Sequence, residues 1–352
     1  MAPGADRPVR RALIVHTGGG LGDVILSTPL AAAIARQHHG VAITWWAAPD
    51  CAGILEGHPF IQQVWAQDPP VPFLTLLGAI RRSRFDLAVL PWTTGRQVWL
   101  AALAGIGRRV GQGGRLAYSH LLTHRVRVRS ARGDVTSHWI DIQLDYARAI
   151  GCEVDGLAPR VHVSDADREA ASASLAGQGL LPREKYCVLH VGKGLPIDDV
   201  PWPCERFVEI GRAVYERYGW KVVATGSGGE MGRVRTVCEG IGPGAVNLAG
   251  RTTLRALAAV LESSVVCVAV DSGPMHLAAA VGARVVGLFA IDGDIVERWR
   301  PYGGRSRTIG TGGWSCARTC IKERCPDYEC MGHIDVAGVL AAVDDLVGRS
   351  PS

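Results

Sequence analysis

The sequence predicts an α/β protein built from two doubly wound, Rossmann-like halves that face each other across a cleft. Short β-branched runs alternate with helical patterns almost from end to end, which is typical of parallel sheets with helices on both faces. The alternation starts again near residues 155–185, and a chain of 352 residues is long enough for about two domains. The 44 glycines fit this picture, because strand-to-helix turns often need positive φ angles or close backbone approach.

The first half opens with the apolar run RALIVHT, which predicts a strand over residues 11–17. Further strands are expected at residues 41–46, 63–66 and 85–90. Helices are expected at residues 22–37, 51–56, 73–82 and 138–150. These elements make up a predicted N-terminal domain, residues 1–165.

The second half repeats the pattern. Strands are expected at residues 186–191, 221–225, 265–270 and 284–289, and helices at residues 165–178, 206–218, 230–239, 254–262 and 275–281. Pro159, Gly177, Gly179 and Pro182 favour a linker between the halves. The predicted C-terminal domain therefore spans residues 180–334, and a helix and tail follow over residues 335–352.

Charge and composition narrow the class of protein. Lys and Arg exceed Asp and Glu by 38 to 33, and the 47% of hydrophobic residues indicate a folded chain rather than a disordered one. No stretch of 18 residues lacks a charge, so a membrane-spanning helix is not expected. The polar start holds three arginines and leads into no apolar signal segment, so we expect a cytoplasmic protein.

A glycine-rich turn, Gly18-Gly19-Gly20-Leu21-Gly22-Asp23, joins the first strand to its helix. It fails the dinucleotide fingerprint G-x-G-x-x-G, because Asp23 or Ile25 stands where the last glycine is required. A carboxylate there would repel a pyrophosphate, whereas the helix N-terminus stabilises the carboxylate as an anion. Asp23 is therefore either a general base for an acceptor hydroxyl or an ordinary helix N-cap.

A second turn, Asp271-Ser272-Gly273-Pro274-Met275-His276, follows a predicted strand and opens a helix. Ser272 and Gly273 leave backbone N–H groups free for an anion, and His276 is close enough to reach the same anion. Asp271 would repel a phosphate, so we expect it to bind a sugar hydroxyl or to order the loop. The alternative is a capped helix with a buried histidine.

Together these segments resemble glycosyltransferase family 9, the heptosyltransferases of lipopolysaccharide core assembly and their relatives. The resemblance extends over residues 11–345. It rests on Leu13-Ile14-Val15, residues 22–30 (GDVILSTPL), Pro201-Trp202-Pro203, residues 247–254 (NLAGRTTL) and residues 271–280 (DSGPMHLAAA). The family implies a GT-B fold that binds ADP-heptose in its C-terminal half and the acceptor in its N-terminal half. It also implies inverting sugar transfer without a metal or other cofactor.

The resemblance also implies roles for individual residues. Asp23 falls on the catalytic base, and Gly22 beside it falls on the acceptor side. The donor diphosphate and sugar fall on Asp271, Ser272, Gly273 and His276. The chemistry agrees, because inverting transfer needs a base on one face of the anomeric carbon and a stabilised leaving diphosphate on the other.

The chain departs from the family pattern at Val200, where relatives commonly carry a lysine that neutralises the leaving phosphate. Lys193, in a loop after a predicted strand, is either its replacement or a solvated surface lysine. The base and ribose of the donor are expected near residues 226–230 (GSGGE), where Gly226 and Glu230 are the candidates and Glu230 would accept ribose hydroxyls. That segment is equally good as a plain turn and helix start.

A basic stretch lies in the N-terminal half. Residues 108–132 contain no acid and seven arginines, namely Arg108, Arg109, Arg115, Arg125, Arg127, Arg129 and Arg132. Such a region attracts an anionic glycan or glycolipid acceptor, or an anionic membrane at the inner face of the cell; a solvated loop is the alternative. Nucleic acid is not expected, because no stacking aromatics or known motif accompany the charge. Arg125, Arg127 and Arg129 alternate with valines, which predicts one charged face of a strand or hairpin, and Arg125 and Arg127 are expected to contact the acceptor.

The ten cysteines form two groups. Six are scattered and are interpreted as small buried hydrophobic residues: Cys51, Cys152, Cys187, Cys204, Cys238 and Cys267. Four lie within 15 residues, Cys316, Cys320, Cys325 and Cys330, without the paired C-x2-C spacing of common zinc modules. They would hold a structural zinc or iron, or remain free thiols; disulfides are the third alternative, which a reducing compartment disfavours. Family members that heptosylate bacterial adhesins carry similar iron-binding clusters.

The sequence thus predicts an enzyme that moves a heptose or related sugar from an ADP-activated donor to an acceptor hydroxyl. Lipopolysaccharide core, another cell-surface or secondary-metabolite glycan, and a protein side chain would each fit as the acceptor. One alternative is a sugar-nucleotide epimerase or hydrolase on the same fold, which needs a second acid or base near the anomeric centre. Another is a non-catalytic sugar-nucleotide-binding protein, which Val200 suggests.

Overall fold

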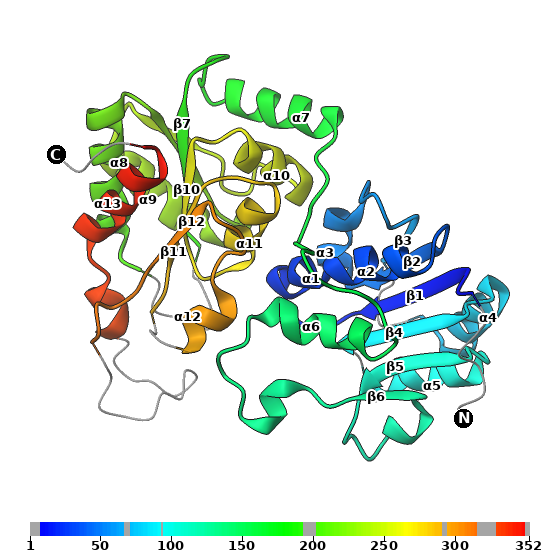
Figure 1. Ribbon diagram of the computed structural model, residues 1–352. Helices are drawn as coiled ribbons and strands as arrows, with labels where there is room; N and C mark the ends of the chain where they lie inside the picture. Colours follow the sequence, from blue (N-terminus) through cyan, green and yellow to red (C-terminus); the bar gives the residue numbers. More distant parts are fainter. Residues whose placement is uncertain are drawn as a thin grey trace. The chain divides into compact units, whose positions relative to one another are not determined.

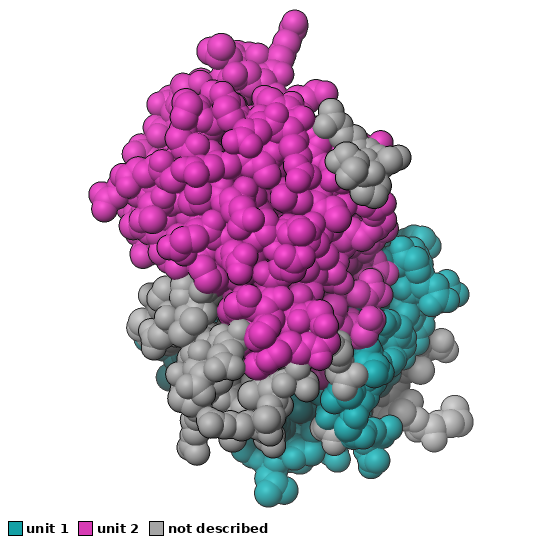
Figure 2. Space-filling model, turned by 90° about the vertical axis from the view of Figure 1, so that its left-hand side faces the viewer, with its two compact units in different colours: residues 1–162 teal, residues 163–352 magenta. Residues whose placement is uncertain are grey.

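The chain divides into two compact units, and each is described by itself (Figure 2). A computed structural model describes residues 8–66, 71–92, 94–192, 202–290, 294–314 and 329–348. Unit 1 is Met1–His162 and unit 2 is Val163–Ser352. Within the described ranges, no helix combines the length and the apolar character that a membrane crossing requires.

Unit 1 is a sheet of six parallel strands in the order β3-β2-β1-β4-β5-β6 (Figure 1). The strands are β1 (Arg11–His16), β2 (Ala42–Ala47), β3 (Gln63–Ala66), β4 (Leu87–Trp92), β5 (Arg108–Gln112) and β6 (His124–Val126). The helices are α1 (Leu21–Ser27), α2 (Pro29–Gln37), α3 (Pro49–Ala52), α4 (Phe73–Ser83), α5 (Gly95–Leu103) and α6 (Trp139–Arg148). Helices α1 and α2 pack with α6, while α4 packs with α5.

The central strands of unit 1 are buried on both faces. In β1, every residue after Arg11 is buried, as expected of a parallel strand covered by helices on each side. The register places Ala12 beside Ile43 of β2 and beside Leu87 of β4. Because β1 lies between β2 and β4, the chain leaves β1 in one direction and later returns to its other side. The carboxyl ends of β1 and β4 thus form the topological switch point of this sheet.

Unit 2 is also a sheet of six parallel strands, in the order β12-β11-β10-β7-β8-β9. The strands are β7 (Tyr186–His190), β8 (Lys221–Thr225), β9 (Ala245–Asn247), β10 (Val266–Val270), β11 (Val285–Leu288) and β12 (Ser306–Ile309). The helices are α7 (Asp165–Ala176), α8 (Cys204–Tyr218), α9 (Met231–Ile241), α10 (Leu254–Glu262), α11 (Gly273–Ala280), α12 (Asp294–Trp299) and α13 (Val336–Leu346). Its switch point lies between β7 and β10.

Helices α7 and α13 are both anchored to unit 2. Helix α7 packs on α10, and Arg255 donates a hydrogen bond of 2.9 Å to Asp167. Helix α13 packs on α8, where Arg217 lies 3.5 Å from Asp344. These contacts place the helix expected near the linker, and the helix expected beyond residue 334, in the same compact unit as the second sheet.

The predicted helix over residues 22–37 is two helices, which is a correction. Pro29 cannot donate a backbone hydrogen bond, so the ladder of α1 cannot continue through it. The Thr28 hydroxyl donates to the Ile25 carbonyl at 2.8 Å and closes the end of α1. The sequence also missed α5, β5, β9, α12 and β12, whereas β6 lies where a charged strand or hairpin was expected around Arg125. The missed strands are short or, like β5, carry arginines, so they show little apolar periodicity.

Candidate functional site

The glycine-rich turn of unit 1 leads directly from β1 into α1. Gly19 has a φ of 74°, in the left-handed region that glycine adopts without strain. Gly20 is the N-cap of α1, and Asp23 is the third residue of the helix. The Gly20 N–H donates a hydrogen bond of 2.8 Å to Asp23 Oδ2. The N-cap interpretation of Asp23 is therefore wrong in position, although its carboxylate does serve the helix start.

The environment of Asp23 suits a proton acceptor. Burial raises the pKa of its carboxyl, against a smaller opposing effect of the Gly20 N–H. A general base works best when its pKa approaches the working pH, so this shift favours proton transfer from a hydroxyl. The carboxylate is half-buried and so remains accessible to a ligand.

An aromatic residue that the sequence analysis did not single out lies beside the same turn. Trp92 ends β4, and its ring lies 6.3 Å from that of His16 and 6.0 Å from that of Trp139. A Cβ on Gly18 would lie 2.1 Å from Trp92 Cδ1, so only glycine allows the indole this close to the turn. The only signal available in the sequence was that Trp92 follows a predicted strand closely, because its pairing with β1 appears only in the structure.

The second turn lies at the switch point of unit 2. Ser272 is the N-cap of α11, and Pro274 occupies its first turn. The first N–H groups of a helix lack partners within that helix, so the start of α11 offers donors to an anion. His276 is 4% exposed and Asp271 is 8% exposed. The structure thus contains the helix start that was predicted to bind an anion. It also contains the buried histidine that the alternative interpretation requires.

The neighbouring strand ends of unit 2 hold the segment predicted for the ribose. Glu230 Oε2 accepts a hydrogen bond of 2.6 Å from the Ser227 N–H. A Cβ on Gly226 would lie 3.2 Å from the Cβ of Glu230, so the absence of a side chain lets the glutamate pack against the turn. Gly226 and Glu230 therefore lie together after β8, next to the end of β7.

His190 is a residue that sequence reasoning missed at this edge. It ends β7, is buried, and its Nδ1 lies 3.1 Å from Thr225 Oγ1. Burial lowers the pKa of His190 to about 4, against an opposing effect of Glu230. Its imidazole is consequently neutral at pH 7. The predicted phosphate partner Lys193 follows three residues later, outside the described residues.

The basic stretch contains both exposed arginines and an arginine that forms an ion pair. Arg125 and Arg127 are exposed, as expected for residues that meet an anionic acceptor. Arg129 instead donates to both carboxylate oxygens of Asp145, at 2.7 and 2.8 Å, and Asp145 raises its pKa. The predicted alternating strand ends at Val126, so Arg127 and Arg129 do not share a strand face with Arg125. This corrects the expectation of one charged strand face shared by Arg125, Arg127 and Arg129.

The cysteines are only partly covered by the structure. Cys51, Cys152, Cys187 and Cys267 are buried, as interpreted, while Cys204 and Cys238 are half-buried. Of the clustered cysteines, Cys330 is described and half-buried, and Cys316, Cys320 and Cys325 lie outside the described residues. Among the residues that are described, no group of three metal-binding side chains occurs.

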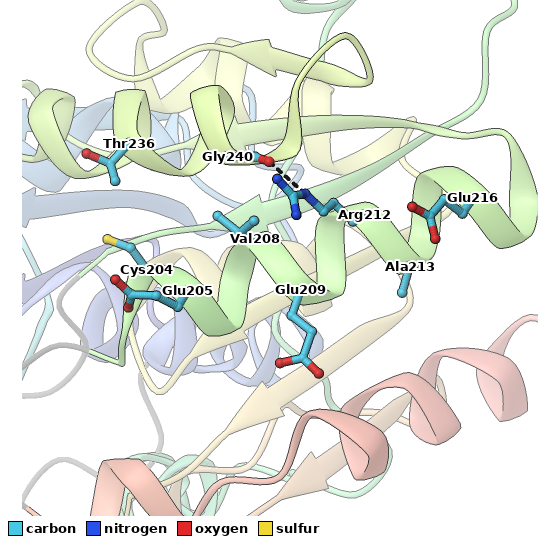
Figure 3. A pocket seen from close by; sticks show the side chains of 9 residues that line it. All are labelled: Cys204, Glu205, Val208, Glu209, Arg212, Ala213, Glu216, Thr236 and Gly240. Atoms are coloured by element: carbon cyan, nitrogen blue, oxygen red, sulfur yellow. Dashed lines mark hydrogen bonds between the residues drawn. The ribbon is translucent and has the colours of Figure 1, made fainter.

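A groove on unit 2 is lined by none of the predicted donor residues that the structure describes. It is lined by Cys204, Glu205, Val208, Glu209, Arg212, Ala213, Glu216, Thr236 and Gly240, and these residues belong to α8 and α9 (Figure 3). Arg212 donates a hydrogen bond of 2.7 Å to the Gly240 carbonyl. Three carboxylates along α8 would repel a diphosphate. The groove is therefore a poor site for a nucleotide donor.

Comparison with known proteins places these features in a family. The profile of glycosyltransferase family 9 (heptosyltransferase) matches residues 73–328. The chain is 24% identical over 352 residues to lipopolysaccharide heptosyltransferase 3 of Escherichia coli, covering 94% of this chain and 97% of that one. It is 28% identical over 345 residues to lipopolysaccharide heptosyltransferase 1 of Pseudomonas aeruginosa, covering 90% and 87%.

Solved structures confirm the predicted fold class. A glycosyl transferase family 9 protein of Veillonella parvula superimposes with a TM-score of 0.83 at 20% identity, over 98% of this chain and 99% of that one. Escherichia coli heptosyltransferase WaaC with ADP-2-deoxy-2-fluoro heptose gives 0.67 at 19% identity, over 95% and 99%. The iron-containing dodecameric glycosyltransferase TibC of enterotoxigenic E. coli gives 0.56 at 15% identity, over 97% and 76%.

Proposed function

Because the chain belongs to glycosyltransferase family 9 and is a glycosyltransferase, we propose that it transfers a heptose from ADP-heptose to a hydroxyl of lipopolysaccharide core. Two relatives that match nearly the whole chain are lipopolysaccharide heptosyltransferases, which supports this sugar and this acceptor. A structural relative was solved with an ADP-heptose analogue, which supports an ADP-activated donor. The proposal includes inversion at the anomeric carbon and a location in the cytoplasm, at the inner face of the cell membrane.

The observation that carries the proposal is the different chemistry of the two switch points. The one in unit 1 presents the half-buried carboxylate of Asp23. The one in unit 2 presents the N-terminus of α11, which opens with Ser272, Gly273 and Pro274 and has no acid in its first turn. A carboxylate suits proton abstraction, and a helix N-terminus suits a departing diphosphate.

The proposed reaction follows from these two groups. An acceptor hydroxyl beside Asp23 gives its proton to the carboxylate while its oxygen attacks the anomeric carbon of the donor. The bond from that carbon to the diphosphate oxygen breaks, and the electron pair leaves with ADP. Backbone N–H groups at the start of α11, with His276, stabilise the charge that develops on ADP. Asp271 orients the donor sugar.

The remaining predicted residues have supporting roles in the proposal. Gly226 and Glu230 receive the ribose of the donor, and Lys193 approaches the leaving diphosphate. Gly22, Arg125 and Arg127 contact the anionic acceptor. A metal held by the cysteine cluster would be structural, because the proposed transfer needs no metal or other cofactor.

The decisive experiment compares donors and then removes the base. ADP-heptose, UDP-sugars and GDP-sugars are titrated by calorimetry, and transfer to truncated lipopolysaccharide is followed by mass spectrometry. We expect binding and transfer with ADP-heptose alone. Asp23→Asn keeps the hydrogen-bond acceptor for the Gly20 N–H but cannot take a proton, so transfer should fall about a thousandfold while donor affinity stays unchanged.

Asp335→Asn is the matched control. Asp335 also accepts backbone hydrogen bonds at a helix start, from Ala337 and Gly338 of α13, but lies outside the predicted site. This variant should transfer heptose like the wild-type protein. Undiminished transfer by Asp23→Asn would exclude Asp23 as the base, and donor binding without any transfer by the wild-type protein would favour a non-catalytic binding protein.

A further inference from the structure

The switch point of unit 1 joins the ends of two strands, and only one of them has been assigned a role. The glycine-rich turn and Asp23 follow β1, whereas Trp92 ends β4. The Thr17 N–H donates to the Trp92 carbonyl at 3.3 Å, so the two chain segments remain paired just beyond the sheet. Ligands of doubly wound sheets bind outside the carboxyl ends of the strands at such a point.

Trp92 and Asp23 flank two consecutive glycines. A Cβ on Gly18 would lie 2.1 Å from Trp92 Cδ1, and a Cβ on Gly19 would lie 2.7 Å from Asp23 Oδ2. Because neighbouring Cα atoms are about 3.8 Å apart, the indole and the carboxylate cannot be separated by more than about 12 Å. The indole and the carboxylate are therefore close enough for one ligand to contact both.

The indole of Trp92 is both supported and open. It remains 41% exposed, although β4 residues from Leu87 to Leu90 are fully buried. The rings of His16 and Trp139 lie against it, and the bare backbone of Gly18 approaches it closely. A large apolar side chain left open at a strand end, and held by its neighbours, is a rigid surface for a ligand with an apolar face.

Polar groups accompany the indole at the same edge. Gln97 of α5 donates a hydrogen bond of 3.0 Å from Nε2 to Thr17 Oγ1. His16 is fully buried, and burial lowers its pKa to about 4, so a neutral imidazole lies beside the indole. An aromatic surface beside a few polar groups is the usual composition of a site that binds a small polar ligand.

We propose that Trp92 is a stacking platform for a sugar ring of the acceptor, which places an acceptor hydroxyl at Asp23. A pyranose ring has an apolar face of C–H groups, which covers the indole, and a rim of hydroxyls. The rim bonds to Thr17 and Gln97. This inference deepens the proposed function and rests on it. It assigns recognition of the neutral part of the acceptor to Trp92, and leaves the anionic part to Arg125 and Arg127.

The test measures acceptor binding without any donor, so that it does not depend on transfer. The probe is deacylated, heptose-deficient lipopolysaccharide, titrated by calorimetry into wild-type protein, Trp92→Ala, Trp92→Phe and Trp99→Ala. Trp92→Ala should weaken binding about tenfold or more, the equivalent of about 1.4 kcal/mol. Trp92→Phe keeps an aromatic face and should lose no more than about threefold. Trp99 is equally exposed, at 41%, but contacts His120 instead, so Trp99→Ala should bind like the wild-type protein.

A second variant tests the geometry without removing the indole. In Gly18→Ala the new methyl group would occupy the space of the Trp92 ring, so the exposed ring must turn away. We expect acceptor binding to weaken as in Trp92→Ala while ADP-heptose binding is unchanged. Melting curves identify any variant that fails to fold, and whichever of Trp92→Ala and Gly18→Ala is folded then carries the comparison.

The outcomes separate this inference from the proposed function. Normal acceptor affinity in folded Trp92→Ala would overturn the platform, even if transfer from ADP-heptose is confirmed. Binding that depends on Trp92, without transfer from ADP-heptose, would keep the platform and overturn the proposed reaction. Wild-type protein that does not bind the glycan would overturn the platform as well.

Discussion

The two sheets have the same strand order and different chemistry at the same place. Counted from β9, the second sheet reads third, second, first, fourth, fifth and sixth strand, which is also the order of the first sheet counted from β3. The switch point of unit 1 carries Asp23 and Trp92, whereas that of unit 2 carries the start of α11 and two buried histidines, His190 and His276. The shared topology determines where a ligand binds, and the local residues determine which ligand it is.

The helix starts show how few residues make this difference. In α1, the third residue is Asp23, whose carboxylate takes up the Gly20 N–H and opposes another anion. In α11, the first turn is Gly273-Pro274-Met275 and contains no acid. The protein's own carboxylate therefore lies at the positive N-terminal end of α1. The corresponding end of α11 carries no carboxylate in its first turn and is suited to a diphosphate.

The largest effect expected from this contrast comes from His276→Ala. Removal of a hydrogen bond to a charged group costs about 1.5–3 kcal/mol, so ADP-heptose affinity should fall about 10- to 100-fold. Acceptor affinity should remain unchanged, in contrast to Trp92→Ala. Calorimetry with each ligand separately measures both effects. Loss of acceptor binding by His276→Ala would contradict the assignment of the acceptor to the switch point of unit 1 and of the donor to that of unit 2.

Much of this contrast could be predicted from sequence. The runs before Thr17 and before Asp271 are apolar and β-branched, so their strands and the turns after them were predictable. The acid in the first turn of α1, and the lack of one in the first turn of α11, were also visible in the sequence. Because parallel strands place their carboxyl ends at one edge of the sheet, the sequence alone indicated that the turns after these two strands lie at such an edge.

Other features needed three dimensions. Trp92 was unremarked because nothing in its local sequence shows that β4 pairs with β1 or that Gly18 will lie against its ring. His190 reads as a strand residue, and its proximity to Thr225 depends on the register between β7 and β8. The engagement of Arg129 depends on Asp145, which lies 16 residues along the chain. Side-chain pairing across elements leaves no periodic signal in the sequence.

A smaller effect is expected from the exposed arginines of unit 1. The double variant Arg125→Ala, Arg127→Ala should slow acceptor association a few-fold at low salt and have little effect at high salt, because exposed charges steer anionic partners and salt screens them. Donor binding should not change. The control is Arg82→Ala with Arg235→Ala, which removes the same charge from exposed positions elsewhere. If acceptor association slows equally in both double variants, the effect comes from net charge and not from the positions of Arg125 and Arg127.

The smallest expected effect is the change in melting temperature caused by Asp23→Asn. Because burial raises the pKa of Asp23, folding favours the protonated carboxyl, and the wild-type protein loses stability as the pH rises through that pKa. Asp23→Asn retains an oxygen for the Gly20 N–H and has no such loss. Its melting temperature should match that of the wild-type protein near pH 3.5 and exceed it by about 1–3 °C at pH 7.5.

Asp335→Asn should behave in the opposite way at pH 7.5, because it removes an exposed carboxylate from a helix start that favours a negative charge. Melting curves of the three proteins across this pH range test both expectations. A variant that gains stability and loses transfer identifies a carboxylate kept for chemistry and not for folding. If Asp23→Asn is instead the less stable protein at pH 7.5, the carboxylate serves mainly to secure the start of α1, and the first switch point loses its proton acceptor.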